Sequence, residues 1–299
     1  MIRFAGFTKT YAGHLAVDRL TLDIERGEVV ALLGPNGSGK TTTLKAAAGL
    51  LSPSAGTVLL GEPGRPASEP GARAAISFLP QRVAFPDSLT GHEVVEFYRR
   101  LRGLDRGRTA DALRFASLNG ASARTVGTYS GGMTQRLGLA VAILPQAPVL
   151  LLDEPTAALD PEGLDAFYGL VERHKGDQQT VLFTSHQLGD VERLADRFAV
   201  LVRGHLRAVL TGRELADRLA ARGVLRLRLD GCPDGLLERV RQISPEASWA
   251  GDQLVVRGAA TERPAIVELA RQAGAEIREL TTEEGRLDTF YRELVQEAP

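Results

Sequence analysis

One glycine-rich segment constrains the fold of this chain more than any other feature. Residues 29–33 form a continuous apolar run, residues 40–48 have a helical pattern that Gly49 ends, and the loop has the sequence Gly34-Pro35-Asn36-Gly37-Ser38-Gly39-Lys40-Thr41. A strand, a GxxxxGK[ST] loop and a helix in this order are typical of a phosphate-binding loop. The glycines let backbone N–H groups face an anion, and the helix N-terminus adds positive charge. The alternative is a glycine-rich turn without a ligand.

Two side chains at the end of this loop supply the chemistry that a nucleotide needs. Lys40 would reach the β- and γ-phosphates, and the Thr41 hydroxyl would bind Mg²⁺. Of the 36 basic residues only four are lysines. One of them stands where a compact ammonium is required, and the wider guanidinium of arginine would not simply replace it. We include Thr42 in the predicted nucleotide-binding set.

A pair of carboxylates follows a second apolar run. Residues 149–152 are all apolar, and Asp153 and Glu154 come next. This pattern puts the two acids at the carboxyl end of a central strand, where α/β proteins bind ligands. Asp153 would hold Mg²⁺, and Glu154 would orient or deprotonate an attacking water. The alternative is a capping pair ahead of Pro155.

A second helix N-terminus suited to an anion follows Tyr129. Here Ser130, Gly131 and Gly132 precede a helical pattern. One nucleotide cannot use two such cradles in one subunit unless they lie close together. We therefore expect a head-to-tail dimer with a second copy or a homologue, in which this loop covers the γ-phosphate bound at the partner's phosphate loop. Taken alone, Ser-Gly-Gly is an ordinary capping turn.

In order and spacing these motifs resemble the ATP-binding cassette (ABC) ATPase family over residues 2–212. The matching elements are Tyr11 (the adenine-stacking aromatic), residues 34–41 (Walker A), Gln81 (Q-loop), residues 130–132 (within the signature motif), residues 149–154 (Walker B), residues 158–160 (D-loop) and His186 (switch histidine). The signature motif departs from the usual pattern, because Tyr129 stands where Leu is usual and Met133 where Gln is usual.

The resemblance implies ATP and Mg²⁺ as ligands and a role for each remaining residue. Tyr11 would stack on adenine, and Gln81 would touch Mg²⁺ or water and report the nucleotide state to a partner. His186 would contact the γ-phosphate beside Glu154, and Asp160 would order the dimer interface. Each residue also has a structural alternative: a strand-end tyrosine, a surface glutamine, a structural histidine and a helix cap.

The predicted fold class is α/β, a P-loop NTPase of ABC ATPase type with a mixed sheet. Residues 1–212 would form the nucleotide-binding domain, with an inserted helical subdomain at about 82–147. The first 33 residues have a strand pattern that predicts an edge hairpin leading into a central strand. Residues 213–299 would form a small α+β accessory domain that includes a helix at 287–295. A regulatory, a dimerising and a passive role for this domain all stay open.

Composition excludes several function classes. The 299 residues carry 36 basic and 37 acidic groups, so bulk electrostatic attraction to nucleic acid is not expected. A single cysteine, Cys232, cannot form an internal disulfide and fits a reducing cytoplasm. No apolar run approaches the roughly 20 residues that span a bilayer. Neither Cys232 nor the five histidines have metal-ligand spacing.

The resemblance implies an ATP-hydrolysing transporter subunit, and with no apolar run of spanning length it would dock on separate integral membrane permease subunits at the cytoplasmic face. Phe85, Phe97 and Tyr98 are candidate docking contacts, with a core position as the alternative for Phe97. Residues 78–81, Phe85 and residues 89–91 resemble single-cassette exporters of the drug, antibiotic and copper-maturation types, among them the nitrous-oxide reductase maturation transporter. Alternatives are another exporter ATPase, a soluble ABC ATPase without a membrane partner, and a nucleotide-gated scaffold that does not hydrolyse ATP.

Overall fold

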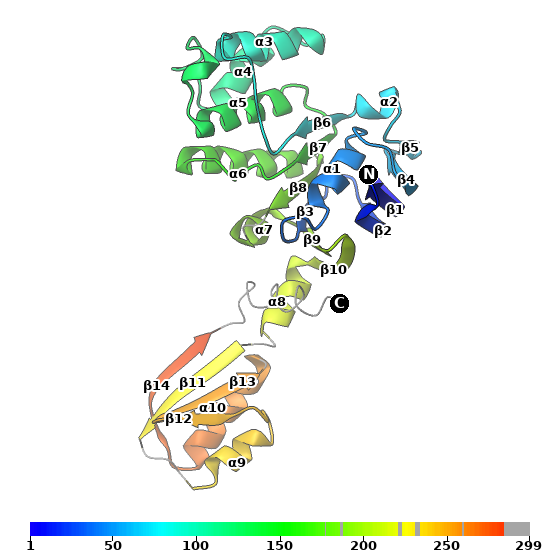
Figure 1. Ribbon diagram of the computed structural model, residues 1–299. Helices are drawn as coiled ribbons and strands as arrows, with labels where there is room; N and C mark the ends of the chain where they lie inside the picture. Colours follow the sequence, from blue (N-terminus) through cyan, green and yellow to red (C-terminus); the bar gives the residue numbers. More distant parts are fainter. Residues whose placement is uncertain (177, 186–187, 221–222, 231–233, 259, 284–299) are drawn as a thin grey trace. The chain divides into compact units, whose positions relative to one another are not determined.

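A computed structural model describes residues 1–176, 178–185, 188–220, 223–230, 234–258 and 260–283. The chain divides into two compact units, Met1–Val209 and Leu210–Pro299, which we describe separately (Figure 1). The division falls three residues before the boundary expected between residues 212 and 213. Among the described residues no helix is both long and apolar enough to cross a membrane.

A largely parallel sheet organises the first unit. Its six strands lie in the order β10 (His205–Thr211), β9 (Arg197–Val202), β3 (Val29–Leu33), β8 (Thr180–Ser185), β7 (Val149–Leu152) and β6 (Ile76–Leu79). The four pairings from β9 to β6 are parallel. Every residue of β3, β7 and β8 is buried, which explains why β3 and β7 are continuous apolar runs and why residues 181–183 of β8 are apolar. The predicted α/β fold of P-loop type is confirmed.

Several helices of the described part of the chain pack on this sheet. They include α1 (Lys40–Ala47) on β7 and β8, α5 (Gly131–Ile143) on β6, and both α6 (Pro161–Gly176) and α7 (Leu188–Leu194) on β8. Helix α1 ends in a left-handed residue, Gly49, whose N–H donates to Ala46 O while Leu50 N–H donates to Lys45 O. Gly49 therefore stops α1, as its sequence pattern predicts.

The N-terminal hairpin belongs to a second sheet rather than to the edge of the first. This sheet has the order β2 (His14–Ile24), β1 (Ile2–Tyr11), β4 (Ala55–Leu60) and β5 (Arg65–Pro66), and all its pairings are antiparallel. The short helix α2 (Pro70–Arg73) follows it. Phe4 and Phe7 of β1 are fully buried in the same core cluster as Leu32 and Leu151 of the parallel sheet. Core packing therefore joins the two sheets. It takes the place of the strand pairing that an edge hairpin of the parallel sheet would make.

The helical subdomain has a core of its own. It contains α3 (Gly91–Leu101), α4 (Gly107–Phe115), the 3₁₀ turn η1 (Val126–Thr128) and α5, which Figure 1 shows grouped at one end of the unit. Thr90 and Glu93 form a reciprocal capping box at the start of α3. Tyr129 donates from its hydroxyl to Ala121 O at 2.8 Å, and a Cβ on Gly91 would lie 2.2 Å from that hydroxyl. The unusual tyrosine therefore fills space that a glycine leaves open.

The second unit begins with α8 (Gly212–Ala220) and then has β-α-β-β-α-β order. The elements are β11 (Gly223–Asp230), α9 (Leu236–Arg241), β12 (Ser248–Ala250), β13 (Gln253–Gly258), the turn η2 (Ala260–Glu262), α10 (Arg263–Gln272) and β14 (Glu276–Glu283). The antiparallel strand order β12-β13-β11-β14 is that of a ferredoxin-like fold. The helix expected at residues 287–295 lies outside the described residues.

Gly49 and Gly61 have similar φ angles but different surroundings. Comparing alanine variants of the two therefore distinguishes the cost of left-handed backbone from the cost of steric overlap. Gly49 has φ 66° and a Cβ there would lie 2.1 Å from Ala67 O, whereas Gly61 has φ 74° and no atom within 4 Å of its Cβ position. We expect Gly61→Ala to lower the free energy of unfolding by about 1–2 kcal/mol, the cost of a left-handed alanine. Gly49→Ala should cost about 1–3 kcal/mol more, because backbone must move. Urea unfolding of both variants measures the difference, and equal losses would contradict the close approach at Gly49.

Candidate functional site

The glycine-rich loop connects β3 to α1, as its sequence predicts. Gly37 and Gly39 have φ values of 80° and 102°, and Gly39 is the N-cap of α1. A Cβ on Gly34 would lie 2.3 Å from Ser38 Oγ and 2.4 Å from Leu201 O. Glycine is thus required at position 34 for close approach and at 37 and 39 for left-handed backbone. Together they bend the chain around the N-terminus of α1.

Lys40 lies over the loop that precedes it. Its Nζ donates to Gly34 O at 2.7 Å and to Pro35 O at 3.2 Å, and the side chain is buried. Burial lowers the pKa of Lys40, while the nearby carboxylates of Glu154 and Asp153 oppose that shift. The ammonium is therefore held among neutral carbonyl oxygens at the mouth of the loop, close to where an anion would sit.

Asp153 and Thr41 meet at the carboxyl edge of the parallel sheet. Thr41 Oγ1 lies 3.2 Å from Asp153 Oδ1, and Thr184 Oγ1 donates to the same oxygen at 2.8 Å. Asp153 is 1% exposed, and burial raises the pKa of its carboxyl group against the effect of the two hydroxyls. Its Oδ2 is buried without a hydrogen-bond partner among the described residues. A buried carboxylate oxygen beside a hydroxyl fits a hard divalent cation such as Mg²⁺.

Glu154 is held by hydrogen bonds to residues of two other segments. Its backbone N–H donates to Thr184 Oγ1 at 2.8 Å, and Gln81 Nε2 donates to its Oε2 at 3.0 Å. Its φ of 47° is unusual for a residue other than glycine. Strain of this kind persists where surrounding contacts hold it and is common at active sites.

Thr184 is the site residue that the sequence motifs do not reveal. It is the next-to-last residue of β8, after the apolar residues 181–183, and its hydroxyl donates to Asp153 while it accepts from Glu154 N–H. A polar residue near the carboxyl end of a buried strand is the only sequence signal for it, and its partners Asp153 and Glu154 lie 31 and 30 positions away. Finding it requires knowing that β7 and β8 are neighbours.

The predicted signature residues begin α5 in the helical subdomain. Ser130 is the N-cap, and its Oγ accepts from Met133 N–H at 3.2 Å. A Cβ on Gly131 would meet no atom within 4 Å, so this side of the loop is open. A Cβ on Gly132 would lie 3.0 Å from Ala158 O in the D-loop segment. Within one chain these residues have the geometry of a helix cap.

Asp160 caps α6. Its Oδ1 accepts from Gly163 N–H at 2.9 Å, and its Oδ2 lies 3.4 Å from the guanidinium of Arg136 in α5. Arg136 is buried, and it also pairs with Glu162 at 3.4 Å. The capping geometry expected as the alternative for Asp160 is present, and the contact with Arg136 links the signature helix to the D-loop.

The structure therefore brings together five predicted residues, which are Lys40, Thr41, Gln81, Asp153 and Glu154. Tyr11 lies at the end of β1, 44% exposed, with Lys9 Nζ 5.1 Å from its ring centroid. Thr42 is half-buried on α1. His186 lies outside the described residues.

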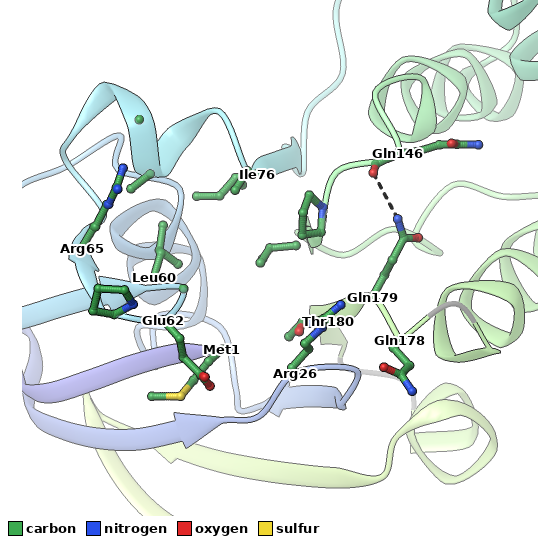
Figure 2. A pocket seen from close by; sticks show the side chains of 17 residues that line it. Met1, Arg26, Leu60, Glu62, Arg65, Ile76, Gln146, Gln178, Gln179 and Thr180 are labelled. Carbon is green, nitrogen blue, oxygen red and sulfur yellow. Dashed lines mark hydrogen bonds between the residues drawn. The ribbon is translucent and has the colours of Figure 1, made fainter.

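A cavity of about 630 Å³ lies at the opposite edge of the parallel sheet. Its lining includes Ile76, Val149 and Thr180 at the amino ends of three strands, and Figure 2 shows Gln179 joined to Gln146 beside it. The predicted site residues are absent from its lining. Because α/β proteins bind ligands at the carboxyl ends of their strands, this cavity is distinct from the phosphate loop. The described residues contain no group of three His, Cys, Asp or Glu side chains placed to hold a metal.

Comparison with known proteins identifies the fold and the family. The model of the ABC transporter family matches residues 17–157. The uncharacterized ABC transporter ATP-binding protein YxlF of Bacillus subtilis is 40% identical over 211 residues, 69% of each chain. The daunorubicin/doxorubicin resistance ATP-binding protein DrrA of Streptomyces peucetius is 38% identical over 76% of this chain and 70% of its own length.

A solved structure agrees with these matches. A dimeric ATP-binding cassette in a post-hydrolysis state, bound to ADP and Pi, superposes with a TM-score of 0.65 at 26% identity. The superposition covers 71% of this chain and 99% of that cassette. This chain therefore belongs to the ABC transporter family of ATP-binding proteins, and it is an ABC-type ATPase.

Proposed function

We propose that this chain is the ATP-hydrolysing subunit of an exporter, working as a head-to-tail dimer that drives separate membrane subunits. The observation that carries the proposal is the cluster in which Thr184 holds Asp153 and Glu154 beside Thr41. In it a buried carboxylate oxygen without a partner among the described residues lies next to a hydroxyl, and a strained glutamate follows directly. This combination suits metal-assisted hydrolysis of a nucleoside triphosphate.

Each residue of the cluster has one role in this proposal. Lys40 exchanges its bonds to loop carbonyls for bonds to phosphate oxygens, and backbone N–H groups of residues 34–42 bind the remaining charge. Asp153 and Thr41 hold Mg²⁺, with Gln81 nearby. When bound, the ion neutralises charge that develops on the phosphate oxygens. Glu154 orients and deprotonates the attacking water.

The remaining predicted residues act at the nucleotide from other segments. His186 contacts the γ-phosphate, and Tyr11 stacks on adenine, for which its exposed ring is available. Ser130, Gly131 and Gly132 cover the nucleotide of a second copy, and the open space at Gly131 supports such an approach. Asp160 takes part in the same interface. The dimeric state of the similar cassette bound to ADP and Pi supports this arrangement.

An export role is supported by the relatives. DrrA carries drug resistance in its name, and this chain covers 70% of it. Export of a drug or antibiotic is therefore the pathway that we favour. The relatives give no support to the expected nitrous-oxide reductase subtype, and the described residues contain no group of three His, Cys, Asp or Glu side chains placed to hold a metal. We do not propose a copper-processing role.

The exposed face of α3 is the docking surface that we propose for the membrane subunits. Phe97 and Leu101, one helical turn apart, are 57% and 68% exposed. Phe85 and Tyr98, which were also expected to dock, pack against the subdomain core and contact each other edge to face. Phe97 is thus the aromatic available to a partner, and its alternative as a core residue is wrong.

Glu154→Gln separates binding from hydrolysis. The amide keeps the size of the side chain but cannot accept a proton, so we expect kcat to fall about 100-fold or more. ATP affinity should persist, and the variant should accumulate as a closed dimer in ATP because hydrolysis no longer reopens it. Phosphate release and size-exclusion chromatography with ATP measure the two effects. Hydrolysis at the wild-type rate would overturn the assignment.

Asp153→Asn tests whether the cation site costs stability. Burial raises the pKa of Asp153 above its ordinary value of about 4, so folding favours the protonated form. The stability cost of the charged form therefore begins as the pH rises past the ordinary value and is complete above the raised one. An unsatisfied buried group costs about 1–3 kcal/mol, of which the variant should recover part. Without divalent cations, it should have the higher free energy of unfolding at neutral pH, and the advantage should disappear as the pH falls to about 4. When ATP is present, Mg²⁺ should raise the free energy of unfolding of the wild type but not that of Asp153→Asn. A variant less stable at neutral pH would contradict this account.

Replacing Phe97 and Leu101 by Ser tests the docking surface. We expect an integral membrane protein to co-purify with the wild-type chain from native membranes in mild detergent. The double variant should bind it roughly tenfold or more weakly, since aromatic anchors dominate such interfaces. ATPase activity of the isolated chain should be unchanged. Leu50→Ser is the matched control, because Leu50 is 60% exposed but lies after α1. Equal binding of the membrane protein by the double variant and the control would exclude α3 as the docking surface.

A further inference from the structure

Asp190 is a buried carboxylate that the proposed mechanism does not use. It lies in the first turn of α7 and is 2% exposed. Its Oδ2 accepts from Thr156 Oγ1 at 2.7 Å and from Ser185 Oγ at 3.3 Å. Its Oδ1 accepts from the Tyr168 hydroxyl at 2.7 Å. Three hydroxyls from three separate segments therefore meet at one carboxylate.

Two of these segments carry site residues. Thr156 lies two positions after Glu154, and it is itself buried. Ser185 ends β8, directly after Thr184 and directly before His186. A bond from Asp190 to both hydroxyls fixes the segment that follows Glu154 relative to the end of β8. The distance between the segment that follows β7 and the end of β8 therefore depends in part on the hydrogen bonds of Asp190.

The third segment anchors the cluster to α6. Burial and the Asp190 carboxylate raise the pKa of Tyr168 to about 12, so its hydroxyl is a donor at neutral pH. The guanidinium of Arg193 lies 4.0 Å from the centroid of the Tyr168 ring. Tyr168 thus joins α6 to α7, and neither helix contains any of the predicted site residues.

The chemistry of the cluster favours a positioning role over simple packing. A buried carboxylate is costly unless its oxygens are hydrogen-bonded, and an apolar side chain would fill the same space at less cost. The bonds here are directional, and they link the two strand ends on which hydrolysis depends.

We propose that Asp190 is a positioning residue for ATP hydrolysis, which holds Thr156 and Ser185 so that Glu154 keeps a fixed distance from the end of β8. This inference rests on the proposed role of Glu154. Asp190 bonds to residues that flank the phosphate site rather than to the predicted phosphate-binding residues. It should therefore affect kcat and leave ATP affinity unchanged.

The first experiment compares Asp190→Ala and Asp190→Asn in the full-length chain. For Asp190→Ala we expect kcat to fall about tenfold or more, since misplacement by 1 Å can cost roughly 100-fold. The Kd for ATP should stay within about twofold of the wild type, because ground-state binding is untouched. Asp190→Asn should recover part of kcat, since the amide oxygen still accepts from hydroxyls. An equal loss of ATP affinity and kcat, or a normal kcat in Asp190→Ala, would overturn the proposal.

The Thr156 variants keep the test decisive if Asp190→Ala does not fold. Thr156→Val has the same shape without the hydroxyl, and Thr156→Ser keeps the hydroxyl. We expect Thr156→Val to lose kcat as Asp190→Ala does, and Thr156→Ser to retain it. Tyr168→Phe is the matched control, because it removes a bond to the same carboxylate but leaves Thr156 and Ser185 in place. It should lower the melting temperature with little change in kcat.

The outcomes separate this inference from the proposed function. If Thr156→Val keeps its kcat, or Tyr168→Phe loses as much kcat as Thr156→Val, the positioning role is wrong even when Glu154→Gln abolishes hydrolysis. If Glu154→Gln hydrolyses ATP normally, the proposed function fails, and the basis of the Asp190 proposal fails with it.

Discussion

The parallel hydrogen bonding of β3, β8 and β7 is the constraint on which the whole site depends. Leu33 pairs with Ser185, and Leu152 pairs with Phe183. Continuing that register by one residue places Asp153 beside Thr184, where the hydroxyl bond is found. A slip of one residue would turn Thr184 to the opposite face of the sheet and separate it from both acids. The apolar burial of three strands thus fixes the position of a polar cluster.

That cluster has features that folding alone would avoid. The ammonium of Lys40 is buried among carbonyls, an oxygen of Asp153 is buried without a partner among the described residues, and Glu154 has a left-handed backbone. Each feature lowers stability, and each is of use only when phosphate or a cation is present. The strands carry this cost because every one of their residues is buried and most are apolar.

Local motifs could be predicted from the sequence because their spacing is short. The phosphate loop, the strand ahead of Asp153 and the glycine that ends α1 all depend on neighbouring residues. Contacts across the sheet could not be predicted, because the order β3-β8-β7 does not follow the chain. The same limit hid the roles of Thr184 and Asp190. Strand β14 was missed for another reason: its side chains are almost all exposed and polar, so apolar alternation is absent.

Strand β8 joins the two polar clusters of the site. Successive side chains of a strand point to opposite faces, so Thr184 and Ser185 face different neighbours. Thr184 bonds to Asp153, and Ser185 bonds to Asp190. Any shift of this strand end must therefore alter the bond to the predicted metal ligand and the bond to α7 together. A single strand end therefore couples the polar cluster at Asp153 to the polar cluster at Asp190.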